Sequence, residues 1–186
     1  MSLGALTTLG KSASSALQDR GWRLMERVVP MALVERMRDD LLAAREICAT
    51  WQQFNRLPLT GGTVHHLPAL REQSSWLSYL QNNPAAPTIA DYFGGPYILN
   101  SMGGNFNEGR NYASEIHRDI RSFQDPCPLL NTLVMLDDFT EDNGATWLMT
   151  FGHILPDQPD DKLFHMHAQQ VTAPAGSILL WNSNLW

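Results

Sequence analysis

Two residues with metal-ligand chemistry, His117 and Asp119, stand two positions apart in the segment SEIHRDI at 114–120. In a β-strand alternate residues point to the same face, so a strand here would project the imidazole and the carboxylate together. A neutral imidazole and a carboxylate are two of the three ligands of a 2-His-1-carboxylate site, which binds Fe(II) and leaves coordination positions open. The spacing is also typical of a surface ion pair, and both interpretations stay open at this point.

Other histidines offer competing chemistry. His165 and His167 also alternate. On a strand they would form a metal clip, which suggests a cupin-like zinc or manganese enzyme as a further hypothesis. Their ordinary interpretation is a loop or edge-strand feature. His65 and His66 follow a Thr-Gly-Gly sequence in a predicted loop that could cover a substrate pocket, although solvated loop histidines show the same pattern.

The second half of the chain, about 96–186, has to position these residues, and its pattern predicts β-structure. Short apolar runs are separated by turn residues, as strands and their connections are. The predicted strands are 98–106, 114–120, 130–136, 146–150, 169–173 and 176–181. Asn143 and Gly144 are typical of a hairpin turn that joins the strand at 130–136 to the next one. Several short strands with turns between them indicate a β-sandwich or jelly roll.

The first half, about 1–95, is predicted to be mainly helical. A strand is expected near Trp22, and Pro30 precedes a helix over 31–47 in which apolar residues recur with the helical period. Shorter helices are expected at 74–80 and 88–93. The whole chain, 1–186, is thus expected to be one domain of the α+β class, mainly β, with N-terminal helices packed on one sheet of the β core.

Three segments in this order resemble the phytanoyl-CoA dioxygenase family of Fe(II)/2-oxoglutarate-dependent oxygenases. The pair His117 and Asp119 looks like the opening of that family's metal site. LDDFTEDNGAT at 136–146 looks like its central hairpin, and PAGSILLWNSNLW at 174–186 looks like its last core strand. The opening stretch, GWRLMERVVPMALVERMRDDL at 21–41, is similar to its N-terminal strand and helix. The order of these motifs is more specific than any one of them.

The resemblance implies a double-stranded β-helix, or jelly roll, that binds Fe(II) through His117, Asp119 and a distal histidine, with 2-oxoglutarate as cosubstrate. It further implies a dioxygenase that uses O2 to hydroxylate a small-molecule substrate, with succinate and CO2 as co-products. In such enzymes the metal and the cosubstrate supply the oxidising chemistry, while the protein positions the substrate. The substrate itself is not implied.

The resemblance also suggests residues around the metal. Asn105 looks like the asparagine that faces 2-oxoglutarate in some members, and an amide can donate to a carboxylate. Ser101 and Thr132 are further candidates for the cosubstrate pocket. Trp181 is a candidate for lining the substrate pocket, together with the loop histidines His65 and His66.

The sequence departs from the family pattern in two places. The distal histidine is expected directly after Trp186, and the arginine that pairs with the far carboxylate of 2-oxoglutarate is expected beyond it. We expect a longer protein to supply both. The alternative is a catalytically inactive jelly-roll module for binding or interaction that lacks the distal ligand. TFGHI at 150–154 also replaces the more usual Pro-Gly-Ser-His, which leaves the role of His153 open.

Composition argues against several other classes. The chain has 13 Lys and Arg against 19 Asp and Glu, a net charge of −6, whereas nucleic-acid binders normally show a basic patch. No apolar run approaches the roughly 20 residues of a membrane span, and no secretory signal is visible at the N-terminus. The two cysteines, Cys48 and Cys127, do not make a disulfide framework, so a reduced, cytoplasmic setting is expected.

Overall fold

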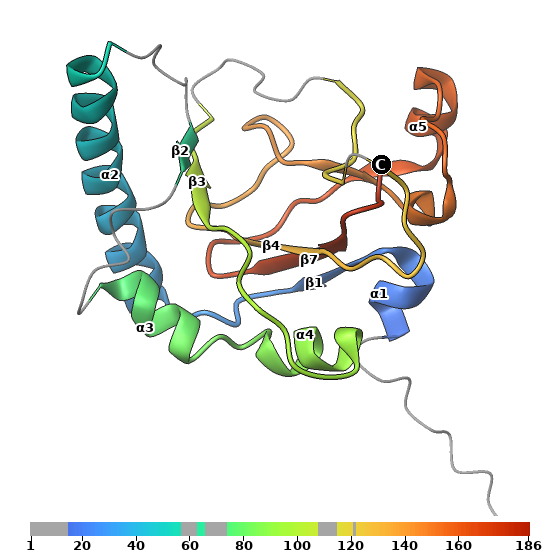
Figure 1. The fold of residues 1–186 in the computed structure, drawn as a ribbon, viewed down its shortest axis with the longest axis horizontal. Helices are drawn as coiled ribbons and strands as arrows, with labels where there is room; N and C mark the ends of the chain where they lie inside the picture. Colours follow the sequence, from blue (N-terminus) through green and yellow to red (C-terminus); the bar gives the residue numbers. More distant parts are fainter. Residues whose placement is uncertain (1–14, 57–62, 66–73, 108–114, 121) are drawn as a thin grey trace, which may run out of the picture.

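The computed structural model describes residues 15–56, 63–65, 74–107, 115–120 and 122–186 (Figure 1). In chain order, the helices and strands are α1 (Ser15–Arg20), β1 (Trp22–Met25), α2 (Met31–Phe54), β2 (Thr63–His65), α3 (Ser75–Gln81), α4 (Ala86–Phe93), β3 (Gly103–Asn105), β4 (Leu130–Val134), β5 (Trp147–Met149), the 3₁₀-helix η1 (Gly152–Ile154), α5 (Asp161–His167), β6 (Ala168–Gln170) and β7 (Ile178–Asn182).

The predicted helices of the first half are confirmed, and local signals explain their ends. α2 begins directly after Pro30 and extends to Phe54, with one face buried: Val34, Met37, Leu41 and Ala44. The side chain of Ser74 accepts a hydrogen bond from the backbone at the start of α3, as N-cap residues do. α4 ends at Gly94 in the left-handed conformation, with φ of 67°. Within the described residues, no helix combines the length and the apolarity needed to cross a membrane.

The largest sheet has the antiparallel order β1-β7-β4, so that the last strand of the sequence lies at its centre. In its register, Trp22 on β1 and Asn131 on β4 both lie opposite Trp181 on β7. Two smaller antiparallel pairs, β2–β3 and β5–β6, complete the sheets of the described residues. The strand predicted to end the core therefore organises the sheet.

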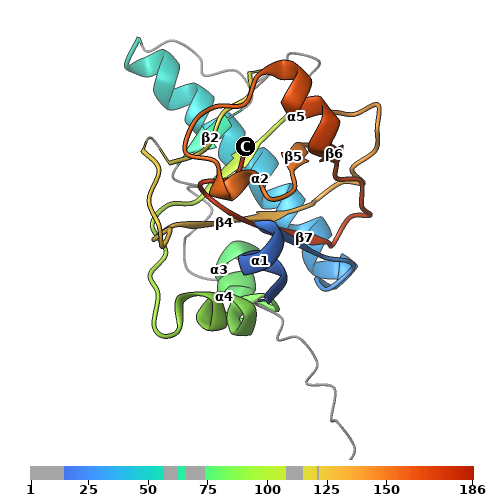
Figure 2. The ribbon, with the colours of Figure 1, turned by 90° about the vertical axis from the view of Figure 1, so that its right-hand side faces the viewer.

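Alternation along β7 gives the sheet two buried faces. Ile178 and Leu180 belong to the apolar cluster formed with α2, α3 and α4. Leu179 points the other way, into a cluster with Leu148 on β5 and the neighbouring Val171. Figure 2 shows α3 and α4 below the sheet, and β5, β6 and α5 above it. One face of the sheet is thus covered by α2, α3 and α4, as predicted for the N-terminal helices, and β5, β6 and α5 lie on the other side.

The α+β class is confirmed, but "mainly β" is corrected. α2 has 24 residues, whereas no strand in the described part of the chain exceeds five. The strand expected at 98–106 contracts to β3, and Ile98 and Leu99 before it are exposed. A strand forms only where a neighbouring strand supplies hydrogen-bond partners for its backbone, so apolar residues alone do not produce one. A closed jelly roll, like the single domain over 1–186, stays a prediction.

The predicted hairpin around Asn143 and Gly144 is also corrected. β4 pairs with β7 and β5 pairs with β6, so the connection from β4 to β5 joins two different sheets. The turn chemistry itself is present, because Gly144 has a φ of 87° and the side chain of Asn143 accepts from the backbone of Thr140. A turn signal fixes a local chain reversal, but it does not choose the strand partner.

His165 and His167 do not form a strand pair, because they end helix α5. The side chain of Asp160 accepts from the backbone N–H of Leu163, and Asp161 follows in the first turn. This N-cap and the acidic first turn favour a helix. Residues two apart on a helix do not face each other, so the shared metal clip predicted for the two histidines is wrong.

Candidate functional site

The candidate site lies at one end of the β1-β7-β4 sheet, where β7 ends beside the start of β4. Asn131 and Trp181 are direct neighbours across these two strands. The segment 115–120 runs past this edge, and the backbone N–H of Ile120 donates to the carbonyl of Ser183 at 3.2 Å. This segment is irregular rather than the predicted strand, so the alternation argument for His117 and Asp119 is corrected.

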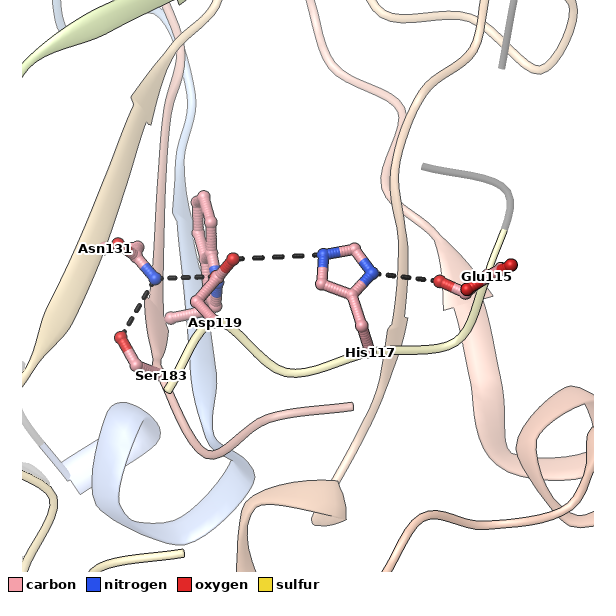
Figure 3. Close-up of polar contacts among 6 residues, drawn as sticks. Glu115, His117, Asp119, Asn131 and Ser183 are labelled. Carbon is pink, nitrogen blue, oxygen red and sulfur yellow. Dashed lines mark hydrogen bonds and ion pairs between the residues drawn. The ribbon is translucent and has the colours of Figure 1, made fainter. Parts of the chain in front are cut away.

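The two side chains nevertheless converge. Nε2 of His117 lies 3.9 Å from Oδ1 of Asp119 (Figure 3). This separation is too long for a hydrogen bond. The side chains are 56% and 40% exposed, respectively, so they face each other at an accessible position rather than inside the apolar core.

Asp119 is held through its other oxygen. Oδ2 accepts hydrogen bonds from Nδ2 of Asn131 at 2.7 Å and from Nε1 of Trp181 at 2.8 Å. Asn131 Nδ2 also donates to Oγ of Ser183 at 2.9 Å, and Figure 3 shows its amide between Ser183 and Asp119. Side chains from two strands therefore fix this carboxylate.

His117 is held locally. Its Nδ1 lies 2.9 Å from the backbone carbonyl of Glu115. A carbonyl only accepts, so Nδ1 is the protonated nitrogen, and in the neutral ring Nε2 carries the free lone pair. That lone pair faces the carboxylate, and two electron-rich atoms in this arrangement are stabilised by a cation between them.

The opposite side of the segment is packed against the last residue of the sequence. The guanidinium of Arg118 lies over the ring of Trp186, with its carbon 4.7 Å from the ring centre, and 5.9 Å from that of Phe123. Nε2 of Gln158 donates to the carbonyl of Ile116 at 3.0 Å. Contacts on both sides therefore fix an irregular segment that no sheet ladder holds.

The pair fits a divalent transition-metal ion such as Fe(II) as two of its ligands. Nitrogen and oxygen ligands lie about 2.0–2.2 Å from such an ion, so neighbouring octahedral ligand atoms are about 3 Å apart. The two atoms, 3.9 Å apart, would reach one ion after a movement of under about 1 Å. The bonds to Glu115 and Asn131 are the outer contacts that orient metal-binding imidazoles and carboxylates. Among the described residues, no group of three or more His, Cys, Asp or Glu side chains could hold a metal.

His153 takes no part in this pair. Its side chain is buried, and Nε2 contacts the backbone carbonyl of Gln18 at 3.0 Å. Nδ1 is buried without a hydrogen bond in the described structure. Burial lowers the pKa of this imidazole, although the bond to Gln18 opposes the shift. His153 links the turn after β5 to α1, which is a structural contact.

Three other predicted site residues differ in their position relative to the pair. Trp181 joins the pair directly, as a donor to Asp119. Thr132 does not, because alternation along β4 turns it to the face opposite Asn131. Asn105 is an exposed residue on β3, on the ribbon face opposite Gly104, which packs against Leu41 of α2.

The structure describes three further predicted residues only in part. Ser101 is exposed and precedes β3. His65 ends β2, with its backbone paired to Gly103, and its side chain lies outside the described residues. His66 also lies outside the described residues.

Asn131 and Ser183 were missed by the sequence analysis. Asn131 stands outside the motifs, and Ser183 lies within 174–186 without a feature that marks it as a site residue. Both matter only through the β4–β7 register. If Trp181 lines the site, its neighbour on the paired strand is a candidate as well, and the β4–β7 register identifies that neighbour as Asn131.

Comparison with known proteins places the chain in a family. The family model for phytanoyl-CoA dioxygenase (PhyH) matches residues 17–186. The chain belongs to this family. This match confirms the family predicted from the sequence. The family is one of Fe(II)/2-oxoglutarate-dependent dioxygenases.

Two solved structures are similar to the chain. AviO1 from Streptomyces viridochromogenes Tue57 matches with a TM-score of 0.64 and 20% identity, over 93% of this chain and 83% of its own. EctD from S. alaskensis, in its apoform, matches with a TM-score of 0.63 and 15% identity, over 99% of this chain and 72% of its own. At such low identities the likeness supports the phytanoyl-CoA dioxygenase fold and nothing about the substrate.

Proposed function

We propose that this protein is an Fe(II)/2-oxoglutarate-dependent dioxygenase that hydroxylates a small-molecule substrate with O2, with succinate and CO2 as co-products. The observation that carries the proposal is the facing pair of His117 Nε2 and Asp119 Oδ1, 3.9 Å apart. The other polar atom of each side chain is already held by a partner. Family membership supports the same chemistry.

Each residue has a distinct task in this proposal. His117 Nε2 and Asp119 Oδ1 would bind Fe(II), and the bound metal and 2-oxoglutarate supply the oxidising chemistry. The carbonyl of Glu115 keeps the imidazole in the tautomer whose Nε2 is free to bind. Asn131 and Trp181 hold the carboxylate, so that the pair is preorganised before the metal arrives.

The third ligand in the proposal is the histidine expected directly after Trp186. The position of Trp186 supports this expectation, because its ring packs under Arg118, the residue between the two ligands. Its backbone carbonyl also accepts from Met149 at 2.8 Å, which fixes the direction of the backbone there. Asn105 remains a proposed contact to 2-oxoglutarate.

Anaerobic addition of Fe(II) and 2-oxoglutarate tests the proposal. The metal-bound cosubstrate should give a weak visible charge-transfer band in the purified protein. His117→Ala and Asp119→Ala should abolish the band, because each removes one ligand. His165→Ala is the matched control, since it removes an exposed histidine from α5.

The outcomes separate the competing hypotheses. A band that never forms would argue for the inactive binding module, whereas a band that survives His117→Ala would show that His117 is not a ligand. Loss of bound metal in His165→Ala would show that the metal binds away from His117 and Asp119. When O2 is admitted, succinate formation that depends on Asp119 would establish turnover of the cosubstrate.

A further inference from the structure

Both hydrogen bonds to Asp119 converge on the same oxygen. Oδ2 accepts from Asn131 at 2.7 Å and from Trp181 at 2.8 Å. A carboxylate oxygen has about two lone-pair directions, so two N–H donors occupy both of them. Oδ1 is the oxygen that faces His117, at 3.9 Å from Nε2. The two oxygens of one carboxylate are therefore assigned different tasks before any metal binds.

The donors that make this distinction are rigidly placed. Asn131 and Trp181 are opposite neighbours in the β4–β7 register. Oγ of Ser183 accepts from the same amide nitrogen of Asn131 at 2.9 Å. A carboxylate only accepts, so the NH2 end of the Asn131 amide is the end that faces Asp119. Groups mounted on paired strands are held more precisely than groups on loops. The loop residue Asp119 thus takes its orientation from the sheet.

We propose that Asn131 and Trp181 are positioning residues that restrict Asp119 to metal binding through Oδ1 alone. This inference rests on the proposed function. An octahedral ion with three protein ligands keeps three positions open, which 2-oxoglutarate and O2 would use. A carboxylate bound through both oxygens occupies one of those positions. By engaging Oδ2, Asn131 and Trp181 keep that position available for the cosubstrate.

The inference predicts an unequal effect on metal and cosubstrate. Without its two donors, Asp119 keeps its charge and can bind the ion through both oxygens. Metal affinity then changes little, while 2-oxoglutarate has to compete with Oδ2 for its position. A residue that only stabilised the fold would lower both affinities in parallel, and a residue that only helped metal binding would lower the metal affinity alone.

The experiment uses the purified protein, with Co(II) as an anaerobic, spectroscopically visible probe. Asn131→Ala and Trp181→Phe are compared with Asn82→Ala and Trp51→Phe, which change the same residue types at exposed positions on α3's end and α2. Affinity for Co(II) is titrated first, and affinity for 2-oxoglutarate is then titrated at saturating Co(II). Infrared difference spectra report the separation of the two carboxylate stretching bands, which narrows when a carboxylate binds through both oxygens.

We expect Asn131→Ala to weaken 2-oxoglutarate binding about tenfold while Co(II) binding changes by less than about threefold. That change is smaller than the usual loss of metal affinity on removing an outer contact of a metal ligand, because the released oxygen of Asp119 can also bind the ion. Trp181→Phe keeps the ring and removes one donor, so it should show the same imbalance to a smaller degree. The controls should match the unsubstituted protein. The band separation should narrow in both site variants.

Two results would overturn the inference while leaving the proposed function intact: equal losses of both affinities, or unchanged band separation in both variants. If His117→Ala does not weaken Co(II) binding, the proposed function itself fails, and the inference fails with it. If Asn131→Ala does not fold, Trp181→Phe decides the question, because it preserves the aromatic packing.

Discussion

The two residues of the candidate metal pair are held in different ways. Asp119 is bonded to Asn131 and Trp181, side chains that arrive from strands distant in the sequence. His117 is bonded to the backbone of Glu115, two residues away on its own segment. The carboxylate therefore depends on the completed sheet, whereas the imidazole depends on the conformation of a short irregular stretch.

This difference indicates how such a site is assembled. Side chains at this end of the sheet fix the carboxylate of Asp119. The imidazole of His117 then needs only a local contact to face it. A site built in this way loses its carboxylate orientation when the sheet edge is disturbed. It loses its imidazole orientation when the segment around residues 115–117 changes. Substitutions at the pair and around it separate these two dependences.

The largest expected effect comes from Asp119→Asn. The substituted amide oxygen can still accept from Asn131 and Trp181, but its NH2 group replaces the metal-binding oxygen that faces His117. Metal affinity should fall at least about 100-fold, or about 2.8 kcal/mol. Calorimetric titration with Co(II) measures this change. A variant that binds Co(II) normally would show that the charge of Asp119 is not used.

Truncating Asp119 and truncating His117 should lower the free energy of unfolding by different amounts. Without metal, Asp119→Ala leaves the N–H groups of Asn131 and Trp181 without their acceptor and should lower the free energy of unfolding by about 1 kcal/mol. The value is at the low end of the usual range because the Asp119 side chain is 40% exposed and water replaces part of the contact. His117→Ala should change it by less than about 0.5 kcal/mol.

Urea unfolding in the presence of a chelator measures both variants on the same scale. Asp119→Asn is the matched control for the first, because it retains an acceptor and should stay close to the unsubstituted protein. Equal destabilisation by His117→Ala and Asp119→Ala would remove the distinction between a ligand held by the sheet and a ligand held locally.

The sequence predicted the parts of the fold that depend on local signals. Pro30 marks the start of α2, Gly94 the end of α4, and the apolar run before Trp186 is the central strand β7. It also predicted the pair of His117 and Asp119, whose side chains do converge. These features follow from residue type and from neighbours within a few positions.

What the sequence did not predict depends on long-range pairing. Alternation on a strand was the wrong reason for the pair, because the segment is held by isolated contacts such as that of Ile120 with Ser183. Asn143 and Gly144 predicted a turn, but the partner of β4 is β7, more than forty residues later. Asn131 acquires its contact to Asp119 only through that register. No local pattern contains this information.

His153 provides a buried histidine to compare with exposed His117. Burial lowers its pKa in the folded protein, so the unfolded chain takes up the proton first. Stability from this residue is therefore complete above the unfolded pKa of about 6.5 and falls as the pH drops through the lowered folded pKa, by at most about 1.4 kcal/mol per pH unit. Urea unfolding between pH 7 and pH 5 should show this loss. His153→Gln should flatten it, whereas His117→Ala should leave it in place.

A smaller effect than that of Asp119→Ala is expected on the other side of the metal-pair segment. Arg118→Leu removes the guanidinium from above Trp186 but keeps an apolar stem, so it should lower the free energy of unfolding by about 0.5–1 kcal/mol. Arg118→Lys should recover part of this loss.

Because Asp119 keeps its bonds to the sheet while the neighbouring backbone loosens, metal affinity should fall mainly through His117. Co(II) titration compares Arg118→Leu, His117→Ala and the double variant. If the two losses of Co(II) affinity add in the double variant, Arg118 acts on Asp119 instead, and the local support assigned to His117 is wrong.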